Sequence, residues 1–456
     1  MDQAKSNGVR RSLPSFLAAA LLAAVLAATA AFTGGAAEAQ GPPGLYVSPS
    51  GDDRHDGSSP ATALRTISAA MSRARPGFTI YVGAGTYHEH VVTQTGGTPG
   101  AEIIVNGSNG RAIIDGSTLS WHRASDQNQA LVELKHPFVK LVGLTIQNSK
   151  DTGVLLAADD LTVEDCAIVA TQLHAISTDT SFQTNRHSST GTMIKNIVLK
   201  NNMVDQASLG GDSQAISLIA DGFAVTGNTV RDSKREGIDI WLGARRGEVT
   251  GNTVYGNAAT GIYVDGASFV KIYDNVVYDN RGGIGVSSES VHYKTNNIWV
   301  YDNVVYDNRE GGVYLWDDKW RPGYKGVQDI LVAHNTMVGN KYAIFVSGEN
   351  ITARILNNLG YATKENVQND GLHTSLVLKG NVWLTDPSGF VSADRKDFHL
   401  TKDSPAIDKG VAVPTIKDGN GGTLQIDTDF DGSTRILGSK PDAGAFEFRE
   451  GAKPSA

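Results

Sequence analysis

Four segments in the middle of the chain share one pattern: FAVTGNTV at 223–230, GEVTGNTV at 247–254, VKIYDNVV at 270–277 and IWVYDNVV at 298–305. Each alternates apolar and polar residues and then reaches a two-residue turn that ends in Asn. Working outward, we find the same pattern in LTVEDCAI (161–168), IVLKNNMV (197–204), ILVAHNTM (330–337), ARILNNLG (353–360) and LVLKGNVW (376–383). The repeats follow one another at intervals of 23 to 36 residues, often 23, which predicts the stacked coils of a solenoid.

The repeats consist of short alternating runs separated by Gly, Asn and Asp, without helical periodicity. They predict an all-β fold, a parallel β-helix of about ten to twelve coils. One coil cannot bury its apolar face alone, so stacking must supply a continuous core. We expect the repeated Asn to point inward at a turn, where side-chain amides hydrogen-bond along the stack. Cys166 occupies the same column, which predicts a buried and inert thiol.

The two ends of the chain depart from the repeat and predict the domain organisation. Residues 40–95 are expected to form an N-terminal cap and the first coil, with a short amphipathic helix near 62–75 over the open end. Residues 96–390 hold the β-helix repeats, and residues 391–456 form a non-repeating C-terminal cover.

Residues 1–39 have the pattern of a signal peptide. The paired Arg10 and Arg11 precede an apolar run over 16–26, and small residues flank a cleavage-like triplet at 37–39. We therefore predict a secreted protein, and the paired arginines are compatible with twin-arginine export. After removal of this segment, no other stretch is long and apolar enough to span a bilayer.

Composition narrows the choice of partners. The formal net charge is −8 and the chain has no basic run, which argues against binding to nucleic acid or to an anionic membrane. A single cysteine excludes an internal disulfide framework. We expect a monomer.

The flanking segments resemble those of a known group of proteins. YVSPSGDDRHDGSSPATALRTI (46–67) and GTYHE (85–89) look like the start of family-nine pectate lyases and of some β-helix xylosidases. The tail, with SPAIDKG (404–410), DFDG (429–432) and PDAGAFE (441–447), resembles the ending of many secreted bacterial β-helix proteins. The resemblance implies a right-handed parallel β-helix of the pectate-lyase-like superfamily.

The resemblance does not carry a reaction with it, because lyases, hydrolases, epimerases and non-catalytic adhesins share this scaffold. The calcium-binding aspartates and the lysine arrangement of family-nine pectate lyases are not recognisable in the chain. A YGFDPH-type motif of alginate epimerases is absent from the sequence as well.

A second strand in each coil supplies the candidate site. In AISLIAD (215–221), GIDIWLG (237–243), GIYVDGA (261–267), GIGVSSE (283–289), GVYLWDD (312–318) and AIFVSGE (343–349), alternation points the third and fifth residues outward. Aromatic residues with carboxylates between them suit sugar rings. The candidate catalytic or calcium-binding carboxylates are Asp239, Asp265 and Glu289, and the candidate sugar-binding aromatics are Trp241, Tyr263, Tyr314 and Trp316.

Basic residues and insertions lie beside this strip. Insertions near 180–194, 287–297 and 316–326 follow the same strand and are expected to form one wall of a groove. The candidate basic and proton-transferring residues are Lys234, Arg235, Arg281, His292 and Lys294.

Three functions remain open from the sequence, and in all of them the ligand is a polysaccharide. A polysaccharide lyase, which we favour, would use calcium on Asp239, Asp265 or Glu289 and a basic side chain for β-elimination from a uronate. An inverting glycoside hydrolase would use two carboxylates, which strand geometry places ~8 Å apart here. A non-catalytic glycan-binding or envelope protein would hold the sugar without turnover. Asp265 is the expected central carboxylate in each case.

Overall fold

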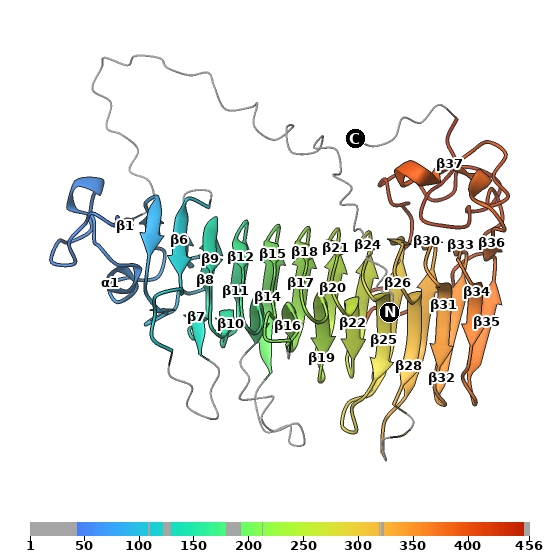
Figure 1. The fold of residues 1–456 in the computed structure, drawn as a ribbon, viewed down its shortest axis with the longest axis horizontal. Coiled ribbons are helices and arrows are strands. Elements are labelled where there is room, and N and C mark those ends of the chain that lie inside the picture. Colours follow the sequence, from blue (N-terminus) through green and yellow to red (C-terminus); the bar gives the residue numbers. More distant parts are fainter. Residues whose placement is uncertain are drawn as a thin grey trace, which may run out of the picture. The chain divides into compact units, whose positions relative to one another are not determined.

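The computed structural model describes residues 43–107, 110–121, 129–178, 193–211, 213–318, 320 and 323–450. The predicted signal peptide therefore lies outside the described residues. Over the described part, the chain winds through about 11 turns of a right-handed parallel β-helix, as the sequence predicts (Figure 1). No helix there is long and apolar enough to cross a membrane.

Three parallel sheets form the walls of the β-helix, and each coil visits them in the order sheet 1, sheet 2, sheet 3. Sheet 1 is made of the strands that precede the Asn turn in each repeat. Its 13 strands in the described chain are β1 (Gly44–Val47), β2 (Thr79–Val82), β5 (Ile103–Asn106), β8 (Val139–Val142), β11 (Leu161–Glu164), β14 (Ile194–Lys200), β17 (Ala220–Thr226), β20 (Arg245–Thr250), β23 (Ser268–Tyr273), β26 (Thr295–Tyr301), β29 (Val327–Ala333), β32 (Ile351–Leu356) and β35 (Ser375–Lys379).

Sheet 2 follows the Asn turn and is made of short strands. Its 12 members among the described residues are β3 (Gly85–Tyr87), β6 (Ala112–Asp115), β9 (Leu144–Gln147), β12 (Ala167–Val169), β15 (Met203–Asp205), β18 (Thr229–Arg231), β21 (Thr253–Tyr255), β24 (Val276–Tyr278), β27 (Val304–Tyr306), β30 (Thr336–Val338), β33 (Leu359–Tyr361) and β36 (Val382–Trp383).

Sheet 3 contains the strands that the sequence marks as functional. The described part of this sheet has 11 strands: β4 (Val91–Val92), β7 (Ala130–Leu134), β10 (Thr152–Leu156), β13 (Ile176–Thr178), β16 (Ile216–Leu218), β19 (Ile238–Trp241), β22 (Thr260–Asp265), β25 (Gly282–Ser288), β28 (Gly311–Asp317), β31 (Tyr342–Ser347) and β34 (Glu365–Asn369).

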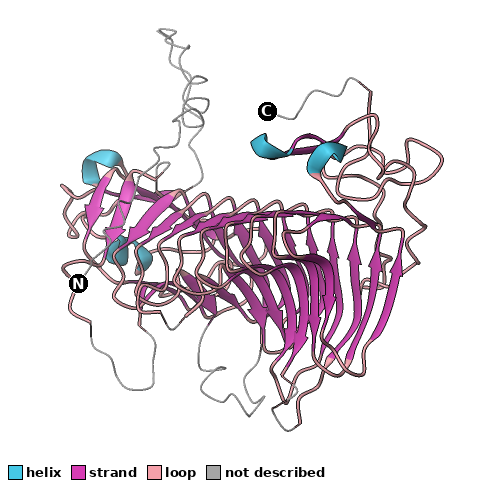
Figure 2. Ribbon diagram, turned by 45° about the vertical axis from the view of Figure 1, so that its right-hand side comes forward, coloured by secondary structure: helices cyan, strands magenta, loops and turns pink. Residues whose placement is uncertain are grey.

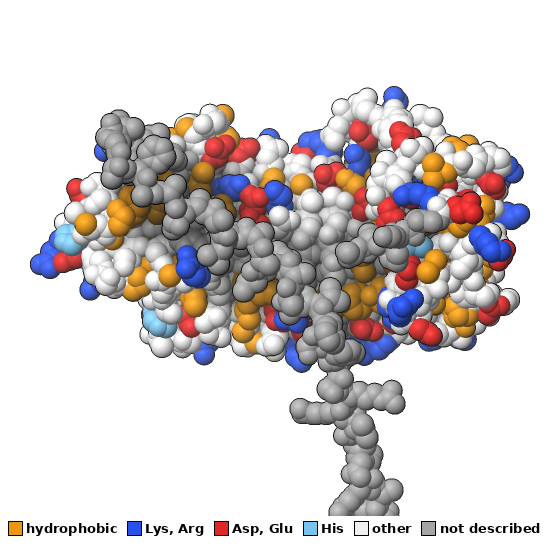
Figure 3. Space-filling model, turned by 90° about the horizontal axis from the view of Figure 1, so that it is seen from above, with side chains coloured by type: hydrophobic (Ala, Val, Ile, Leu, Met, Phe, Trp, Pro, Cys, Tyr) orange, Lys and Arg blue, Asp and Glu red, His pale blue; other side chains and the backbone are white. Residues whose placement is uncertain are grey.

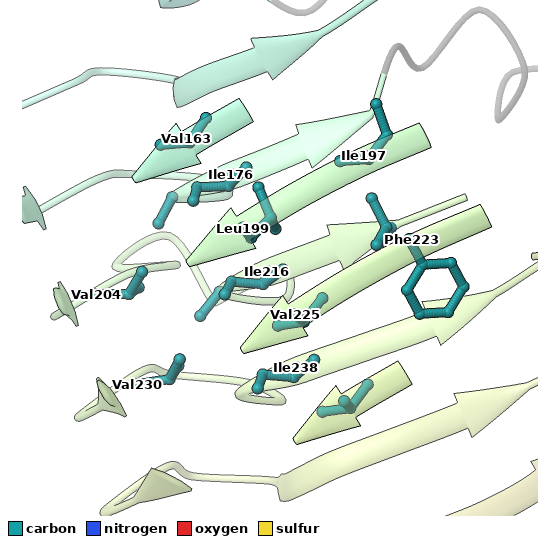
Figure 4. Close-up of a cluster of buried hydrophobic side chains, with 14 of the residues drawn as sticks. Val163, Ile176, Ile197, Leu199, Val204, Ile216, Phe223, Val225, Val230 and Ile238 are labelled. Atoms are coloured by element: carbon teal, nitrogen blue, oxygen red, sulfur yellow. The ribbon is translucent and has the colours of Figure 1, made fainter. Parts of the chain in front are cut away.

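Inward residues from the three sheets fill one continuous apolar core. One example is the run of strands β17, β18 and β19, which belong to sheets 1, 2 and 3. Their residues Val225, Val230 and Ile238 are each fully buried. Figure 4 shows how such residues stack on their equivalents in the next coil. Stacking thus buries the apolar face that one coil leaves open.

An asparagine ladder closes the corner between sheets 1 and 2. From Asn202 to Asn381, each described side-chain amide donates to the Oδ1 of the next Asn along the stack, at 2.9–3.0 Å. The backbone N–H of Cys166 donates to Asn202, so the cysteine occupies the ladder's column as predicted. Burial raises the pKa of its thiol to about 12, which keeps the sulfur protonated.

The residue before each ladder asparagine adopts a left-handed conformation. Gly227, Asp274 and Asn357 have φ of 67°, 53° and 56° at this position. Gly, Asn and Asp tolerate this region better than other residues. The requirement explains why the repeats read GN, DN or NN at the turn.

A second ladder, which the sequence analysis missed, closes the corner between sheets 2 and 3. Asn257, Asn280, Asn308 and Asn340 are linked by amide hydrogen bonds of 2.9–3.1 Å. Their sequence intervals match those of the first ladder, so the same repeat analysis contains the signal.

Removal of one rung tests the ladder. Asn303→Ala would leave the backbone and side-chain donors of Asn275 without their acceptor and would remove one of the two donors to Asn335 Oδ1 in a buried corner. Because an unpaired buried polar group costs about 1–3 kcal/mol, we expect the free energy of unfolding to fall by about 2–4 kcal/mol. Urea denaturation measures the change. Asn420→Ala, in an exposed turn, is the control, and equal small effects at both sites would contradict the structural role.

A small helical cap covers the first coils. The 3-10 helix η1 (Pro60–Thr62) precedes α1 (Ile67–Met71), which is shorter than the predicted helix near 62–75. Glu89 accepts the N–H groups of Ile67 and Ser68, and the apolar side of α1 joins the core. Pro76 lies five residues beyond the end of α1 and disfavours a helical conformation at Arg75, the last residue of the predicted helix.

The C-terminal segment packs on the outer sides of sheets 1 and 2 in the later coils (Figures 1 and 2). It contains η3 (Pro387–Gly389), η4 (Ala393–Arg395) and the antiparallel pair β37 (Phe390–Ser392) and β38 (Asp397–Leu400). Leu424 covers Trp299 and Tyr301 of sheet 1, and Phe446 belongs to the cluster over sheet 2. Seen from above, acidic and basic side chains are interspersed over this part of the molecule (Figure 3).

A buried ion pair fixes this segment to the β-helix. Arg435 pairs with Asp302, the left-handed residue before the ladder's Asn303, and both side chains are almost fully buried. Arg435 also lies 3.5 Å from Glu447 and donates to the carbonyl of Gly444. Removal of one partner would leave an uncompensated buried charge.

His399 predicts a pH-dependent contribution to the stability of the C-terminal segment. Burial opposes its charge, but Asp397 at 2.6 Å and Asp431 at 3.0 Å raise its pKa above the ordinary 6.5. The protonated ring therefore stabilises the fold fully below pH 6.5, and this contribution is lost as the pH rises through the raised pKa. Melting curves at several pH values should show the largest deficit of His399→Gln on the acidic side. A deficit that grows toward alkaline pH would contradict this assignment.

Candidate functional site

The strand register brings the predicted residues into two rows on the outer face of sheet 3. In the first row, Asp239, Tyr263, Gly285, Tyr314 and Phe345 are direct neighbours on successive strands. The second row is Trp241, Asp265, Ser287, Trp316 and Ser347. Both rows follow the predicted alternation.

A cavity of about 410 Å³ lies over these rows, between the coils of β19 and β31. Its volume is in the range of sites that hold a few small rings. Five predicted residues line it: Arg281, Glu289, Tyr263, Tyr314 and Trp316. The rest of its lining is Glu236, Ala259, Thr260, Glu310, Gly311 and Phe345.

Tyr263 links two strands and the loop after β25. Its hydroxyl donates to Glu289 Oε1 at 2.5 Å and accepts from Ser287 Oγ at 2.6 Å. Burial raises the pKa of Tyr263 well above its usual value, and nearby Tyr314, Glu289 and Asp265 add to the effect. The phenol therefore stays protonated at neutral pH and holds the Glu289 carboxylate in place.

Gly285 gives Tyr314 the room to lie across the floor of the cavity. A Cβ at Gly285 would lie 2.4 Å from Tyr314 Cζ and 2.8 Å from Tyr263 Cδ2. The Tyr314 hydroxyl crosses over and hydrogen-bonds to Thr260 Oγ1, two strands away. The two tyrosine rings, with centroids 6.3 Å apart, form an aromatic floor.

Two predicted carboxylates point away from the core but are not exposed, which corrects the expectation of an open strip. Asp239 is 2% exposed and Asp265 is 7% exposed. The loop after β25 folds back toward the ends of β19 and β22, where Gly243 and Gly266 leave space for Tyr293. Asp265 Oδ1 accepts the N–H of Glu289 at 2.7 Å and so anchors this loop.

Burial changes the charge of Asp239. Desolvation, followed by the negative charges of Glu236, Asp265 and Glu289, raises its pKa well above the usual value. Burial therefore favours the neutral acid form of Asp239 more strongly than in an exposed aspartate. Asp239, Asp265 and Glu289 are thus electrostatically coupled.

The three carboxylates do not fit a calcium site as they are arranged. In the described ranges, no three or more His, Cys, Asp or Glu side chains are grouped so that they could hold a metal ion. Asp265 and Glu289 instead direct oxygens to the Glu289 amide and to Tyr263. Calcium binding stays a prediction that needs a direct measurement.

The remaining predicted residues lie outside the cavity lining. Four of them are exposed to solvent: Lys234, Arg235, His292 and Lys294. Arg235 lies 3.5 Å from Glu236. Trp241 is half-buried and donates to Ser217 at 3.1 Å. The insertion expected near 180–194 lies almost wholly outside the described residues.

The sequence did not lead us to two acidic residues that lie just before strands of sheet 3. The basic residues there were predicted, but not Glu236 and Glu310, which line the cavity. Arg281 Nε donates to Glu310 Oε1 at 2.9 Å. Arg281 and Glu310 occupy the same position in adjacent repeats. An alignment of the repeats at that position would therefore have predicted the pair.

A second cavity, of about 650 Å³, lies under the C-terminal segment. His334, Val411, Leu424 and Arg435 are among its lining residues. None of the residues predicted for the site contributes to it. Its lining residues lie where this segment attaches to the corner between sheets 1 and 2.

The fold is that of a right-handed β-helix protein of the pectate-lyase-like superfamily. The model for a Pel9A-like right-handed β-helix region matches residues 45–234, and one for a right-handed β-helix region matches 215–320 and 243–360. The uncharacterized protein YwoF of Bacillus subtilis (strain 168) is 31% identical over 357 residues, which are 71% of this chain and 72% of that protein. The chain belongs to the same family as YwoF.

Solved structures share the fold at low identity. Pectate lyase Pel9A is 19% identical with a TM-score of 0.57, over 89% of this chain and 96% of that one. XylC in complex with xylose is 13% identical with a TM-score of 0.56, over 88% and 98%. A GH136 lacto-N-biosidase from Eubacterium ramulus is 13% identical with a TM-score of 0.53, over 75% and 67%. These likenesses establish the fold alone.

The aromatic floor can be tested with Gly285→Ala. The added methyl group must displace Tyr314, so we expect a loss of about 1–3 kcal/mol in the free energy of unfolding. In a Tyr314→Ala background most of this loss should disappear, because the clashing ring is gone. Chemical denaturation of the four proteins in this cycle measures the coupling. An equal loss in both backgrounds would refute the proposed packing.

Proposed function

We propose that the protein is a secreted glycoside hydrolase that cleaves a neutral glycan in the sheet 3 cavity. One observation carries the choice: the lining combines four aromatic residues with three glutamates and one arginine. Aromatic faces suit the apolar faces of sugar rings, and carboxylates suit their hydroxyl edges.

The charges favour an uncharged substrate. The lining holds three glutamates against one arginine, even though Arg281 pairs with Glu310 and Arg235, outside the lining, lies 3.5 Å from Glu236. A uronate at the cleavage point would be repelled in this partly buried site. A neutral sugar avoids that cost.

Glu289 is the proposed catalytic carboxyl group, because it lines the cavity and Tyr263 holds it. Glycoside hydrolysis needs a second carboxyl group, and Asp265 and Asp239 lie in the two coils below. Strand geometry places the Cα atoms of Asp265 and Glu289 ~8 Å apart. Inversion at the anomeric carbon requires two carboxyl groups far enough apart to admit an attacking water, and the stereochemistry of the product measures this.

A polysaccharide lyase, the function favoured from the sequence, is the second candidate. Arg281 supports it, because a guanidinium beside Tyr263 and Tyr314 could neutralise a uronate carboxylate. The tyrosines would then serve in proton transfer. No step of either proposal is routed through a metal ion.

Product analysis separates the two reactions. The protein is incubated with neutral and uronate-containing polysaccharides, with calcium or with a chelator. We expect new reducing ends from a neutral polysaccharide, without the ultraviolet absorbance of unsaturated uronate ends. A rise in that absorbance would establish the lyase instead, and its loss with chelator would reveal a metal requirement. Binding without products would indicate a glycan-binding protein.

Glu289→Gln tests the catalytic carboxyl group. The amide can still accept from Tyr263 but cannot transfer the proton, so we expect turnover to fall about a hundredfold or more with little change in melting temperature. Glu248→Gln is the matched control, because Glu248 accepts from Tyr273 on sheet 1, away from the cavity. Asp265→Asn and Asp239→Asn, assayed alongside, identify the second group. Full activity of Glu289→Gln would place the site elsewhere.

A further inference from the structure

Two lysines continue the strand-entrance column beyond the cavity. Arg281, Glu310, Lys341 and Lys364 immediately precede β25, β28, β31 and β34, whose strands are neighbours in sheet 3. Lys341 and Lys364 are therefore adjacent in successive coils, and both are exposed. Like charges side by side on neighbouring strands are destabilising.

These two lysines differ from the arginines in the same column. Arg235 and Arg281 lie 3.5 Å and 2.9 Å from the carboxylates of Glu236 and Glu310. Among the residues that the structure describes, neither Lys341 nor Lys364 has a carboxylate at ion-pair distance. Protection of an edge strand would explain Lys364 before the terminal β34, but β31 is paired on both sides.

Both ammonium groups instead converge on one aromatic platform. Lys341 Nζ and Lys364 Nζ lie 5.2 Å and 5.3 Å from the centroid of the Tyr342 ring, and Lys364 also donates to the Tyr342 hydroxyl at 3.0 Å. The Tyr342 ring stacks on Phe345 at 5.4 Å and 20°. Phe345 lines the cavity, so this platform continues the cavity's aromatic surface.

We propose that Lys341, Lys364 and the stacked Tyr342–Phe345 pair form an accessory subsite for an acidic sugar or another anionic substituent of the bound glycan. The subsite rests on the proposed function, because it needs a glycan in the cavity. It lies two to three coils from the strand of Glu289, or about 10–14 Å along the helix axis. The substrate class is thus a neutral main chain that carries acidic groups.

This placement separates two electrostatic environments on one ligand. The glutamates around the cavity favour a neutral unit at the cleavage point. The two ammonium groups attract an anion two to three coils from the strand of Glu289, where the negative charge of that residue is largely screened. A carboxylate between two ammonium groups would also relieve their mutual repulsion.

The test compares acidic oligosaccharides with their own neutral forms. The probes are xylo-oligosaccharides that carry glucuronic acid and oligogalacturonates, each before and after chemical reduction of the carboxyl groups. Binding to the full-length exported protein is measured by calorimetry at low and high salt. We expect one acidic probe to bind about tenfold more tightly than its reduced form at low salt, and the difference to shrink at high salt.

Variants assign the effect to the two lysines. Lys341→Met/Lys364→Met should abolish the preference for the acidic form and leave binding of the reduced form unchanged. Lys195→Met/Lys379→Met, on exposed positions of sheet 1, should retain the preference. All four positions are exposed, so melting temperatures should stay close to the parental value. The single variants serve if the double variant does not fold.

The outcomes distinguish this inference from the proposed function. Equal binding of acidic and reduced probes, or no binding of any acidic probe, overturns the subsite. A preference that survives in Lys341→Met/Lys364→Met overturns it too. If neutral glycans are still cleaved in such a case, the hydrolase stands without the subsite. If an acidic probe shows the lysine-dependent preference but nothing is cleaved, the proposed hydrolase fails while the subsite stands.

Discussion

Hydrogen bonding at the corners of the coils is the constraint on which the rest of the structure depends. Each corner turns the backbone inward between two sheets, where water is excluded and an unpaired N–H costs about 1–3 kcal/mol. An asparagine meets this need with one side chain. Asn228 accepts the N–H of Asn202 in the preceding coil and donates to the carbonyl of Leu199. The same requirement explains the left-handed Gly, Asn or Asp that precedes it.

The ladders also hold the register on which the site depends. The intervals between ladder residues reach 28 and 32 where loops are inserted after β25 and β28, yet the hydrogen bonds of Asn303 and Asn335 keep their length. Insertions therefore leave the β-helix without shifting the strands. The rows that hold Tyr263 and Trp316 stay aligned across these coils, and the loops are free to shape the cavity.

Strand alternation explains which part of the site could be predicted from sequence. It placed Tyr263, Tyr314 and Trp316 on one outward face, because side chains alternate strictly along a strand. It could not show that Asp239 and Asp265 are buried, or that the loop after β25 returns to the space left by Gly243 and Gly266. The Arg281–Glu310 pair and the second ladder both join residues that occupy the same position in neighbouring coils. They follow from the repeat once every position of a coil is aligned, not only the Asn column.

The C-terminal segment explains why the cavity lies on sheet 3. Aromatic residues occupy outward positions on all three walls, so an outward aromatic side chain does not identify a site by itself. On sheet 1, Leu424 and its neighbours bury Trp299 and Tyr301, and these rings serve packing. On sheet 3, Tyr263 and Tyr314 border an open cavity, and their hydroxyl groups bond to Glu289 and Thr260. Because the cover occupies two walls of the later coils, the uncovered wall is the one on which rigid strands can present side chains to a ligand.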